Sequence, residues 1–296
     1  MDLGSANIFL TGGTGSFGSA FIQFLIETDN IPKQLTVYSR DWQKQYALRE
    51  KVGNPSWIQW VIGDVRDLHR LQNVIHGHNL IIHAAAIKCI VACEQNATEC
   101  LLTNVIGTQN VIDAIKSSAS IQTKAILIST DKAVHPINTY GTSKKMAEKL
   151  WVNAVTPLNK FAVCRYGNVI GSSGSVLPKY MSLIMDGAES LPVTDERMTR
   201  FWYPMEDAIK FVLDSLEKMK NNEVFIPRIP SIRIVDLVSA LNMKYHVVGI
   251  RPGEKLHEYM IAPSDINDDP GYYSGNNPDF LTVKQIVKSI QEIKYV

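Results

Sequence analysis

The feature that most constrains this chain is a glycine-rich turn close to its N-terminus. The apolar run 8–10 is followed directly by TGGTGSFG at 11–18, and an amphipathic stretch begins there. Glycine permits a tight turn and lets backbone N–H groups approach a phosphate at a helix N-terminus. Because a strand precedes the glycines and a helix follows them, the turn predicts a dinucleotide-binding fold. The residues expected to contact the dinucleotide here are Gly12, Thr14, Gly15, Ser16, Phe17 and Gly18.

Short apolar runs alternate with helix-like stretches through the first two thirds of the chain. Strands are predicted at 8–10, 35–38, 57–62, 80–83, 125–128 and 161–164, and helices at 17–28, 42–51, 66–76, 97–117 and 140–154. This alternation predicts an α/β fold, a Rossmann-like doubly wound parallel sheet. Ligands of such a sheet bind beyond the carboxyl ends of its strands.

The pattern changes after residue 165. Gly, Ser and Pro become dense, helices are predicted only near 205–220 and 233–241, and 263–280 is rich in Asp, Pro, Gly and Asn. We therefore expect a dinucleotide-binding domain over 1–165 and a smaller, irregular substrate lobe over 166–296. From that lobe the chain can cross back to the sheet.

Composition narrows the possible partners. The chain has 45% hydrophobic and 20% charged residues, and its 30 Lys+Arg against 29 Asp+Glu leave a net charge of +1. This balance gives no electrostatic case for nucleic acid, and no apolar run reaches the roughly 18 residues of a membrane helix. No signal peptide is recognised. The four cysteines are irregularly spaced, so we expect reduced thiols, a cytoplasmic location and no metal site.

The end of the second predicted strand bears on the choice of cofactor. It reads Tyr38-Ser39-Arg40-Asp41, with Lys44 beyond. An acidic residue at this point holds the ribose 2′-hydroxyl of NAD, whereas Arg suits a 2′-phosphate. Ser39, Arg40 and Lys44 therefore favour NADP, while the alternative is that Asp41 binds the ribose and the cations are solvated. Further cofactor contacts are expected from Asp64 and Val65 at the adenine, and from the small residues Ala84 and Ala86.

A second constellation follows the strand predicted at 125–128. The chain continues into Ser129-Thr130-Asp131-Lys132, and a helix begins near Tyr140. Tyr140 and Lys144 are one helical turn apart, so their side chains share a face. An ammonium beside a phenol lowers the pKa of the phenol, which makes Tyr140 usable as a base. The alternative is a plain amphipathic helix.

With these motifs the chain resembles the extended short-chain dehydrogenases/reductases. Within them it is similar to the inverting nucleotide-sugar 4,6-dehydratases that act on UDP-N-acetylglucosamine. STDKA (129–133) and RPGEKLHE (251–258) are the most specific motifs. The others are TGGTGSFG (11–18), YSRD (38–41), HAAAIK (83–88), TNVIGTQNV (103–111), YGTSK (140–144), RYGNVIGSSGSV (165–176) and TDERMTRFW (194–202). The chain departs from the resemblance after Met260 and at Cys89-Ile90.

The resemblance implies a three-step reaction that consumes no NADP. Hydride leaves C4 of the sugar while Tyr140 removes the 4-hydroxyl proton, and Lys144 also holds the nicotinamide ribose. In the Thr130-Asp131-Lys132 stretch, Asp131 is the acid at C6 and Lys132 the base at C5. Lys132 must be neutral for this role, and we expect desolvation by the bound sugar and the charge of Lys144 to lower its pKa. The alternative is an ordinary ion pair in a turn.

The resemblance also implies the substrate site. Arg200 and Arg251 suit a pyrophosphate, Asn168 and Lys88 suit sugar or phosphate oxygens, and Glu254 suits the uridine ribose. Further substrate-site residues are Asn104, which holds backbone near the site, Val176, which covers the uracil, Thr194 and Met198. The expected partners are a UDP-sugar and further copies of the chain, in a dimer or hexamer.

Other readings of the same motifs stay open. The enzyme could be a 4,6-dehydratase of another UDP- or dTDP-hexose, a UDP-sugar 4-epimerase or a simple dehydrogenase. Outside enzymology, the chain could be an NADP-sensing regulator, although such a protein is expected to lack Tyr140 or Lys144. Inversion at C5 is predicted because Lys132 stands where retaining relatives carry Glu.

Overall fold

A seven-stranded parallel sheet organises the larger part of the molecule. The computed structural model describes residues 1–118, 122–263 and 271–294. The strand order is β3-β2-β1-β4-β5-β6-β9. The strands are β1 (Asn7–Thr11), β2 (Gln34–Ser39), β3 (Ile58–Ile62), β4 (Leu80–His83), β5 (Thr123–Thr130), β6 (Asn159–Tyr166) and β9 (Val224–Phe225). This order confirms the predicted doubly wound α/β fold, because successive strands add outward from β1 in both directions.

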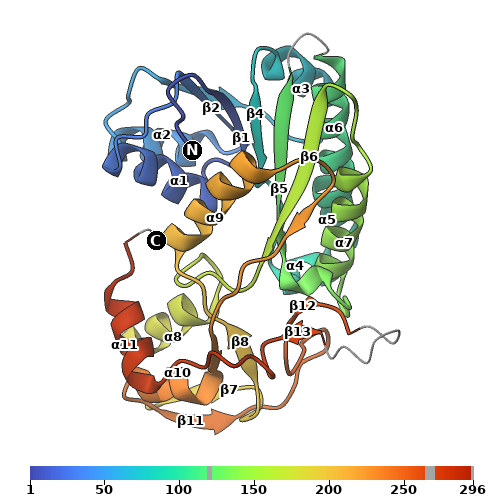
Figure 1. Ribbon diagram of the computed structural model, residues 1–296. Coiled ribbons are helices and arrows are strands. Elements are labelled where there is room, and N and C mark those ends of the chain that lie inside the picture. The colour runs from blue at the N-terminus through green and yellow to red at the C-terminus, as the bar shows by residue number, and fades with distance from the viewer. Residues whose placement is uncertain (119–121, 264–270, 295–296) are drawn as a thin grey trace.

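Helices cover both faces of the sheet (Figure 1). One face carries α1 (Ser16–Glu27), α2 (Trp42–Lys51) and α9 (Met205–Lys218), and the other carries α3 (Leu68–Ile75), α6 (Gly107–Ser117) and α7 (Thr139–Val152). Side chains of one strand alternate between the two cores: Ile8 and Leu10 pack with α1, while Phe9 packs with α3 and α6. Such strands are buried on both faces, which is why they appear in the sequence as continuous apolar runs.

A smaller lobe packs around a third apolar cluster. Its elements are α8 (Val176–Met185), β7 (Ser190–Val193), β8 (Thr199–Phe201), β10 (Ser231–Arg233), α10 (Ile234–Ala240), β11 (Lys244–Val247) and α11 (Val283–Gln291). The hairpin of β12 (Tyr259–Ile261) and β13 (Tyr272–Tyr273) lies beside the carboxyl ends of the sheet strands, between the two lobes (Figure 1). Residues beyond 165 also return to the sheet, since β9 pairs with β6 and α9 packs on α1. None of the helices in the described ranges has the length and apolarity needed to cross a bilayer.

The helix predicted over 97–117 is confirmed in its span, but a π-helical turn interrupts its regular α-helical geometry. The structure has α4 (Ile90–Gln95), α5 (Ala97–Leu101), a π-helical turn η1 (Leu102–Ile106) and then α6. The wide turn carries Asn104, whose side chain accepts from Ile87 N at 2.8 Å and donates to Ile87 O at 3.0 Å. Two helices of the smaller lobe, α8 and α11, were also not predicted. Part of the predicted irregular stretch 263–280 lies outside the described residues.

Candidate functional site

The glycine turn forms a cradle at the carboxyl end of β1. Gly12 has φ +68°, and a Cβ there would lie 2.7 Å from Ala85 N. A Cβ on Gly18 would collide with the backbone of Gly13. Helix α1 begins at Ser16 after the N-cap Gly15, and no side chain caps it. Its N-terminal N–H groups and positive dipole end are therefore available to a phosphate.

Charged side chains meet at the ends of β2 and β3. Arg40 Nη1 lies 3.7 Å from Asp64 Oδ2, and Arg40 and Lys44 side chains are 51% and 69% exposed. The Asp41 carboxylate caps α2 by accepting from Lys44 N at 3.0 Å. The Ser39 hydroxyl accepts from the Gln45 amide at 2.9 Å. Asp41 thus caps its own helix, and its Oδ2 lies 3.9 Å from Lys44 Nζ, while the side chains of both cations are more than half exposed.

The predicted catalytic residues converge at the carboxyl end of β5. Asp131 and Lys132 lie in the 3₁₀ turn η2 (Asp131–Ala133), and Tyr140 and Lys144 lie on α7. Lys132 Nζ donates to Asp131 Oδ1 at 2.9 Å. The Thr130 hydroxyl donates to the same carboxylate oxygen at 2.9 Å and also hydrogen-bonds the Tyr140 side chain. A chain of polar contacts therefore runs from the phenol to the ammonium.

Proton affinities in this cluster differ from those expected. Burial opposes a charge on Lys132, but the carboxylates of Asp131 and Glu258 outweigh it and raise the pKa of Lys132. The structure instead has the ion pair with Asp131 that was the stated alternative, and Glu258 adds a second carboxylate that was not expected. Burial raises the pKa of Asp131, and the Glu258 charge adds to this, against the opposing charge of Lys132. A raised pKa suits Asp131 to act as an acid.

The Tyr140–Lys144 pair also behaves differently from the prediction. Burial raises the pKa of Tyr140 to about 12, and the groups that oppose this are Lys132 and Thr130, not Lys144. Burial lowers the pKa of Lys144 to about 8, against the charge of Glu148. Lys144 Nζ donates to Ile128 O at 2.8 Å. The charge that supports a phenolate at Tyr140 therefore comes from η2 across the site.

A buried ion pair supports α7 from behind. Arg165 Nη2 lies 2.6 Å from Glu148 Oε2, and Arg165 Nε donates to Glu148 Oε1 at 2.9 Å. The Ser129 hydroxyl donates to the same carboxylate at 2.6 Å. Arg165 Nη1 donates to Met260 O at 2.8 Å. One network thus joins the end of β5, the helix that carries Tyr140, and strand β12.

The predicted substrate residues occupy the interface between the lobes in different ways. Asn168 Oδ1 accepts from Lys132 Nζ at 3.3 Å. Arg200 is 8% exposed, and its Nη atoms donate to the carbonyls of Thr199, Lys255 and Leu256 at 2.7–3.1 Å. Its guanidinium is therefore committed largely to backbone. Arg251 forms a two-pronged pair with Glu254, at 2.9 and 3.1 Å.

The remaining predicted residues line the same region. Lys88 Nζ donates to Ser16 Oγ at 3.4 Å, which places it over the glycine turn. Ser173 N donates to the same hydroxyl at 3.1 Å, so the loop before α8 touches that turn as well. Val176 begins α8, and Thr194 and Met198 are buried between β7 and β8.

Glu258 is the site residue that sequence reasoning missed. Its carboxylate is 4% exposed, and Oε1 lies 3.4 Å from Lys132 Nζ. The signal was present, because Glu258 ends the specific motif RPGEKLHE. The motif alone did not say which of its residues meets the catalytic turn.

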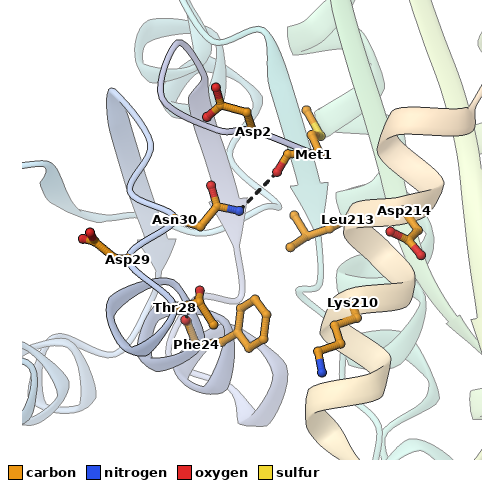
Figure 2. Close-up of a pocket in the computed structure, with 9 residues that line it drawn as sticks. All are labelled: Met1, Asp2, Phe24, Thr28, Asp29, Asn30, Lys210, Leu213 and Asp214. Atoms are coloured by element: carbon orange, nitrogen blue, oxygen red, sulfur yellow. Dashed lines mark hydrogen bonds between the residues drawn. The ribbon is translucent and has the colours of Figure 1, made fainter.

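A cavity of about 610 Å³ lies elsewhere. Figure 2 shows it between the N-terminus, the end of α1 and α9, with Asn30 donating to Met1 O at 3.2 Å. Residues 1–2 of its lining lead into β1 and residues 28–30 lead into β2, so the cavity lies toward the amino ends of these strands. The rest of its lining comes from α1 and α9. None of the predicted site residues lines this cavity.

A Rossmann-type sheet with a buried Tyr-x₃-Lys pair beyond its strands defines an extended short-chain dehydrogenase/reductase. Comparison with known proteins narrows this class. The polysaccharide biosynthesis protein family matches residues 8–273, and the chain belongs to it.

The similar proteins with known activities act on nucleotide sugars. A UDP-N-acetylglucosamine 4,6-dehydratase (inverting) of Campylobacter jejuni is 47% identical over 265 residues, which are 88% of this chain and 78% of that protein. A UDP-glucose 4-epimerase of Rickettsia canadensis is 37% identical, with the same coverage of 88% and 78%. The crystal structure of a dTDP-glucose 4,6-dehydratase from Streptomyces venezuelae, with NAD and TYD bound, superposes with a TM-score of 0.79 at 20% identity over 96% of each chain. The predicted resemblance is thereby confirmed.

Proposed function

We propose that this chain is a nucleotide-sugar 4,6-dehydratase that converts UDP-N-acetylglucosamine to a UDP-4-keto-6-deoxy sugar with inversion at C5. The observation that carries the proposal is the buried contact of 2.9 Å between Asp131 and Lys132, beside Tyr140 and Lys144. An epimerase or dehydrogenase needs only the Tyr-Lys pair. Loss of water needs an acid and a base in addition, and this pair provides both. The 47% identical dehydratase relative supports the same activity.

The residues at the carboxyl end of β1 fit a nicotinamide dinucleotide. The backbone packs so closely around Gly12 and Gly18 that neither position has room for a Cβ. The uncapped N-terminus of α1 lies at the same turn. When bound, the cofactor would accept hydride from C4 of the sugar and return it to C6. Gly12 to Gly18 would hold the pyrophosphate, and Ala84 and Ala86 would leave space above β4.

The chain's own residues would move the protons. Tyr140 would take the proton of the 4-hydroxyl, assisted by the nearby charge of Lys132. The C4 ketone then acidifies the hydrogen on C5, which Lys132 would remove as a neutral amine. Asp131 would protonate the departing C6 hydroxyl. Its Oδ2 is buried and has no hydrogen-bond partner within the described residues, so this oxygen keeps an unused capacity for a hydrogen bond.

For the cofactor we propose NADP. Arg40 and Lys44 are solvent-accessible cations at the end of β2, while the Asp41 carboxylate is occupied in capping α2. Arg can grip a phosphate with two N–H groups. The related structures with NAD in their descriptions are of other proteins, at 20% identity or below. The contents released on denaturing purified protein, separated by chromatography, would distinguish the two.

The function is tested by incubating the protein with UDP-N-acetylglucosamine and measuring the mass of the sugar nucleotide. Loss of one water supports the dehydratase. An isomerised sugar of unchanged mass would instead identify a UDP-sugar 4-epimerase, the second candidate, which the 37% identical Rickettsia relative favours. No change with this sugar, and none with UDP-glucose or dTDP-glucose, would refute catalysis on these substrates.

We further propose a cytoplasmic homo-oligomer. Leu101, Ile106 and Met146 are 42–51% exposed on α5, η1 and α7, which supports contact with another copy. Light scattering of the purified protein would measure the mass of the assembly.

A further inference from the structure

Lys132 is surrounded by three acceptors. Its Nζ lies 2.9 Å from Asp131 Oδ1, 3.3 Å from Asn168 Oδ1 and 3.4 Å from Glu258 Oε1. A lysine ammonium has three N–H donors, so each can point at one acceptor. Asp131 and Asn168 were predicted as site residues, in a catalytic and a substrate-binding role. Glu258 was not predicted, and it adds a second carboxylate from the other lobe.

Glu258 is held in this position by its backbone and its neighbours. Its N–H donates to Ser274 Oγ at 3.0 Å, and its carbonyl accepts from Ser274 N at 2.8 Å. Lys255 Nζ donates to Val134 O at 2.7 Å and lies 3.5 Å from Glu258 Oε2. The Asn138 side chain donates to Gly253 O at 2.8 Å. The segment 253–258 is thus fastened to the loop that carries Lys132.

The charges of Glu258, Lys132 and Tyr140 affect one another in turn. Burial disfavours a charge on Glu258, but Lys132, Arg200 and Lys255 outweigh it and lower the pKa of that carboxyl. The ionised Glu258 favours the charged form of Lys132. The charge on Lys132 in turn favours the phenolate of Tyr140 against the effect of burial. Glu258 therefore acts on Tyr140 through Lys132.

We propose that Glu258 is a positioning residue that keeps Lys132 protonated while Tyr140 accepts the proton of the sugar 4-hydroxyl. This inference rests on the proposed function. It states that the positive charge that assists the first step, the C4 oxidation, is on Lys132 and not on Lys144.

The elimination needs the opposite state, a neutral Lys132 and a protonated Asp131. One proton passing from Lys132 Nζ to Asp131 Oδ1 across their 2.9 Å contact creates both groups at once. Lys132 then takes the proton from C5, and Asp131 gives its proton to the C6 hydroxyl, which leaves as water. The ammonium and the carboxylate are restored, so these two residues need no outside proton for this step.

Glu258→Gln tests the proposal, because Gln keeps the size and an acceptor oxygen but removes the charge. Without that charge Lys132 should become neutral about 1–3 pH units lower, the usual effect of an adjacent opposite charge. In single turnovers, the C4 oxidation should then fall off at a correspondingly lower pH. The elimination should fall off with it, because the Lys132–Asp131 pair has then lost to solvent the proton that Asp131 must give to the C6 hydroxyl. Glu258→Asp keeps the charge, so it should lower the rate without displacing the profile. Equal losses in both variants with no displacement would overturn the proposal and leave Glu258 a structural role.

A second measurement does not depend on activity. Lysine-labelled protein is titrated by NMR without substrate, with Lys132→Met identifying the signal. The Lys132 signal should titrate 1–3 units earlier in Glu258→Gln. It should be unchanged in Glu254→Gln, whose carboxylate pairs with Arg251 instead. Should Glu258→Gln not fold, Glu258→Ala should produce a shift in the same direction, because it also removes the carboxylate charge.

The two proposals can fail separately. A wild-type protein that releases no water from any sugar nucleotide tested refutes the dehydratase function. An unchanged Lys132 titration in the folded Glu258→Gln variant refutes the role of Glu258, whatever the reaction.

Discussion

The buried pair of Glu148 and Arg165 should be the most sensitive point of the catalytic helix to substitution. Glu148→Ala removes a carboxylate that accepts three hydrogen bonds, from Ser129 Oγ, Arg165 Nε and Arg165 Nη2, at 2.6–2.9 Å. It leaves the Arg165 guanidinium, whose side chain is 16% exposed, without its counter-charge. Breaking one partner of a buried pair costs about 3–5 kcal/mol. For a chain of this size the melting temperature should fall by roughly 10 °C.

Thermal unfolding followed by circular dichroism measures this effect, with Glu206→Ala as the matched control. Glu206 pairs with Lys210 at 2.7 Å on the surface of α9, where the lysine is 55% exposed. Such a pair contributes about 0.5 kcal/mol, so the control should melt within roughly 2 °C of wild type. The double variant Glu148→Met, Arg165→Met removes both charges and should lose less stability than Glu148→Ala. A Glu148→Ala protein that melts like the control would refute the reasoning.

Four further outcomes are expected. Tyr140→Phe should abolish C4 oxidation, whereas Asp131→Asn and Lys132→Met should stall after it, with reduced cofactor visible by absorbance; identical behaviour of the two classes would contradict the division of roles. Arg40→Ala should weaken NADP but not NAD by about 1.5–3 kcal/mol, or roughly 10- to 150-fold in Kd by calorimetry. Gly12→Ala should abolish cofactor binding, while Gly77→Ala, also at positive φ but with no atom within 4 Å of its Cβ, should only cost about 1–2 kcal/mol of stability. Burial lowers the pKa of Lys144 from 10.5 to about 8, so between these pH values the folded state binds fewer protons than the unfolded state. The free energy of unfolding of wild type should therefore gain a contribution from Lys144 as the pH rises over this range. Denaturant unfolding at several pH values should show this gain in wild type and not in Lys144→Met.

The sheet could be predicted because its strands are buried on both faces. The predicted strand 80–83 and helix 42–51 coincide with β4 and α2. The π-helical turn inside the helix predicted over 97–117 could not be found this way. It carries Asn104, whose side chain is bonded to Ile87 in the loop after β4. Hydrophobic periodicity carries information about one element at a time and none about contacts between elements. The small strands of the second lobe were missed because they are two to four residues long.

The same limit applies to the candidate site. Motifs brought Asp131, Lys132, Tyr140 and Lys144 into one prediction, and the structure places all four at the carboxyl end of β5 or on α7. Their proton affinities could not be predicted, because these depend on which charges come close after folding. Helical spacing suggested that Lys144 acts on Tyr140. The charge that opposes burial at Tyr140 comes instead from Lys132, whose own pKa is raised by Asp131 and by Glu258, a residue from a distant part of the sequence.

Inversion at C5 places a specific demand on these charges. A base that removes the C5 proton from one face cannot return it to the other, so a second group must deliver it there. After elimination Lys132 carries the proton it removed as an ammonium, and the adjacent Asp131 has lost one to water and is a carboxylate. The pair, in contact at 2.9 Å, is therefore back in its starting state without returning a proton to the sugar. Tyr140 has meanwhile gained the proton of the 4-hydroxyl and is the remaining proton carrier of the cluster. If Tyr140 is the second group, the product made in D₂O should carry deuterium at C5, exchanged through the phenol, and its proton couplings should report the L-arabino ring. A D-xylo product would mean that Lys132 returns its own proton, which would keep the dehydratase but refute inversion.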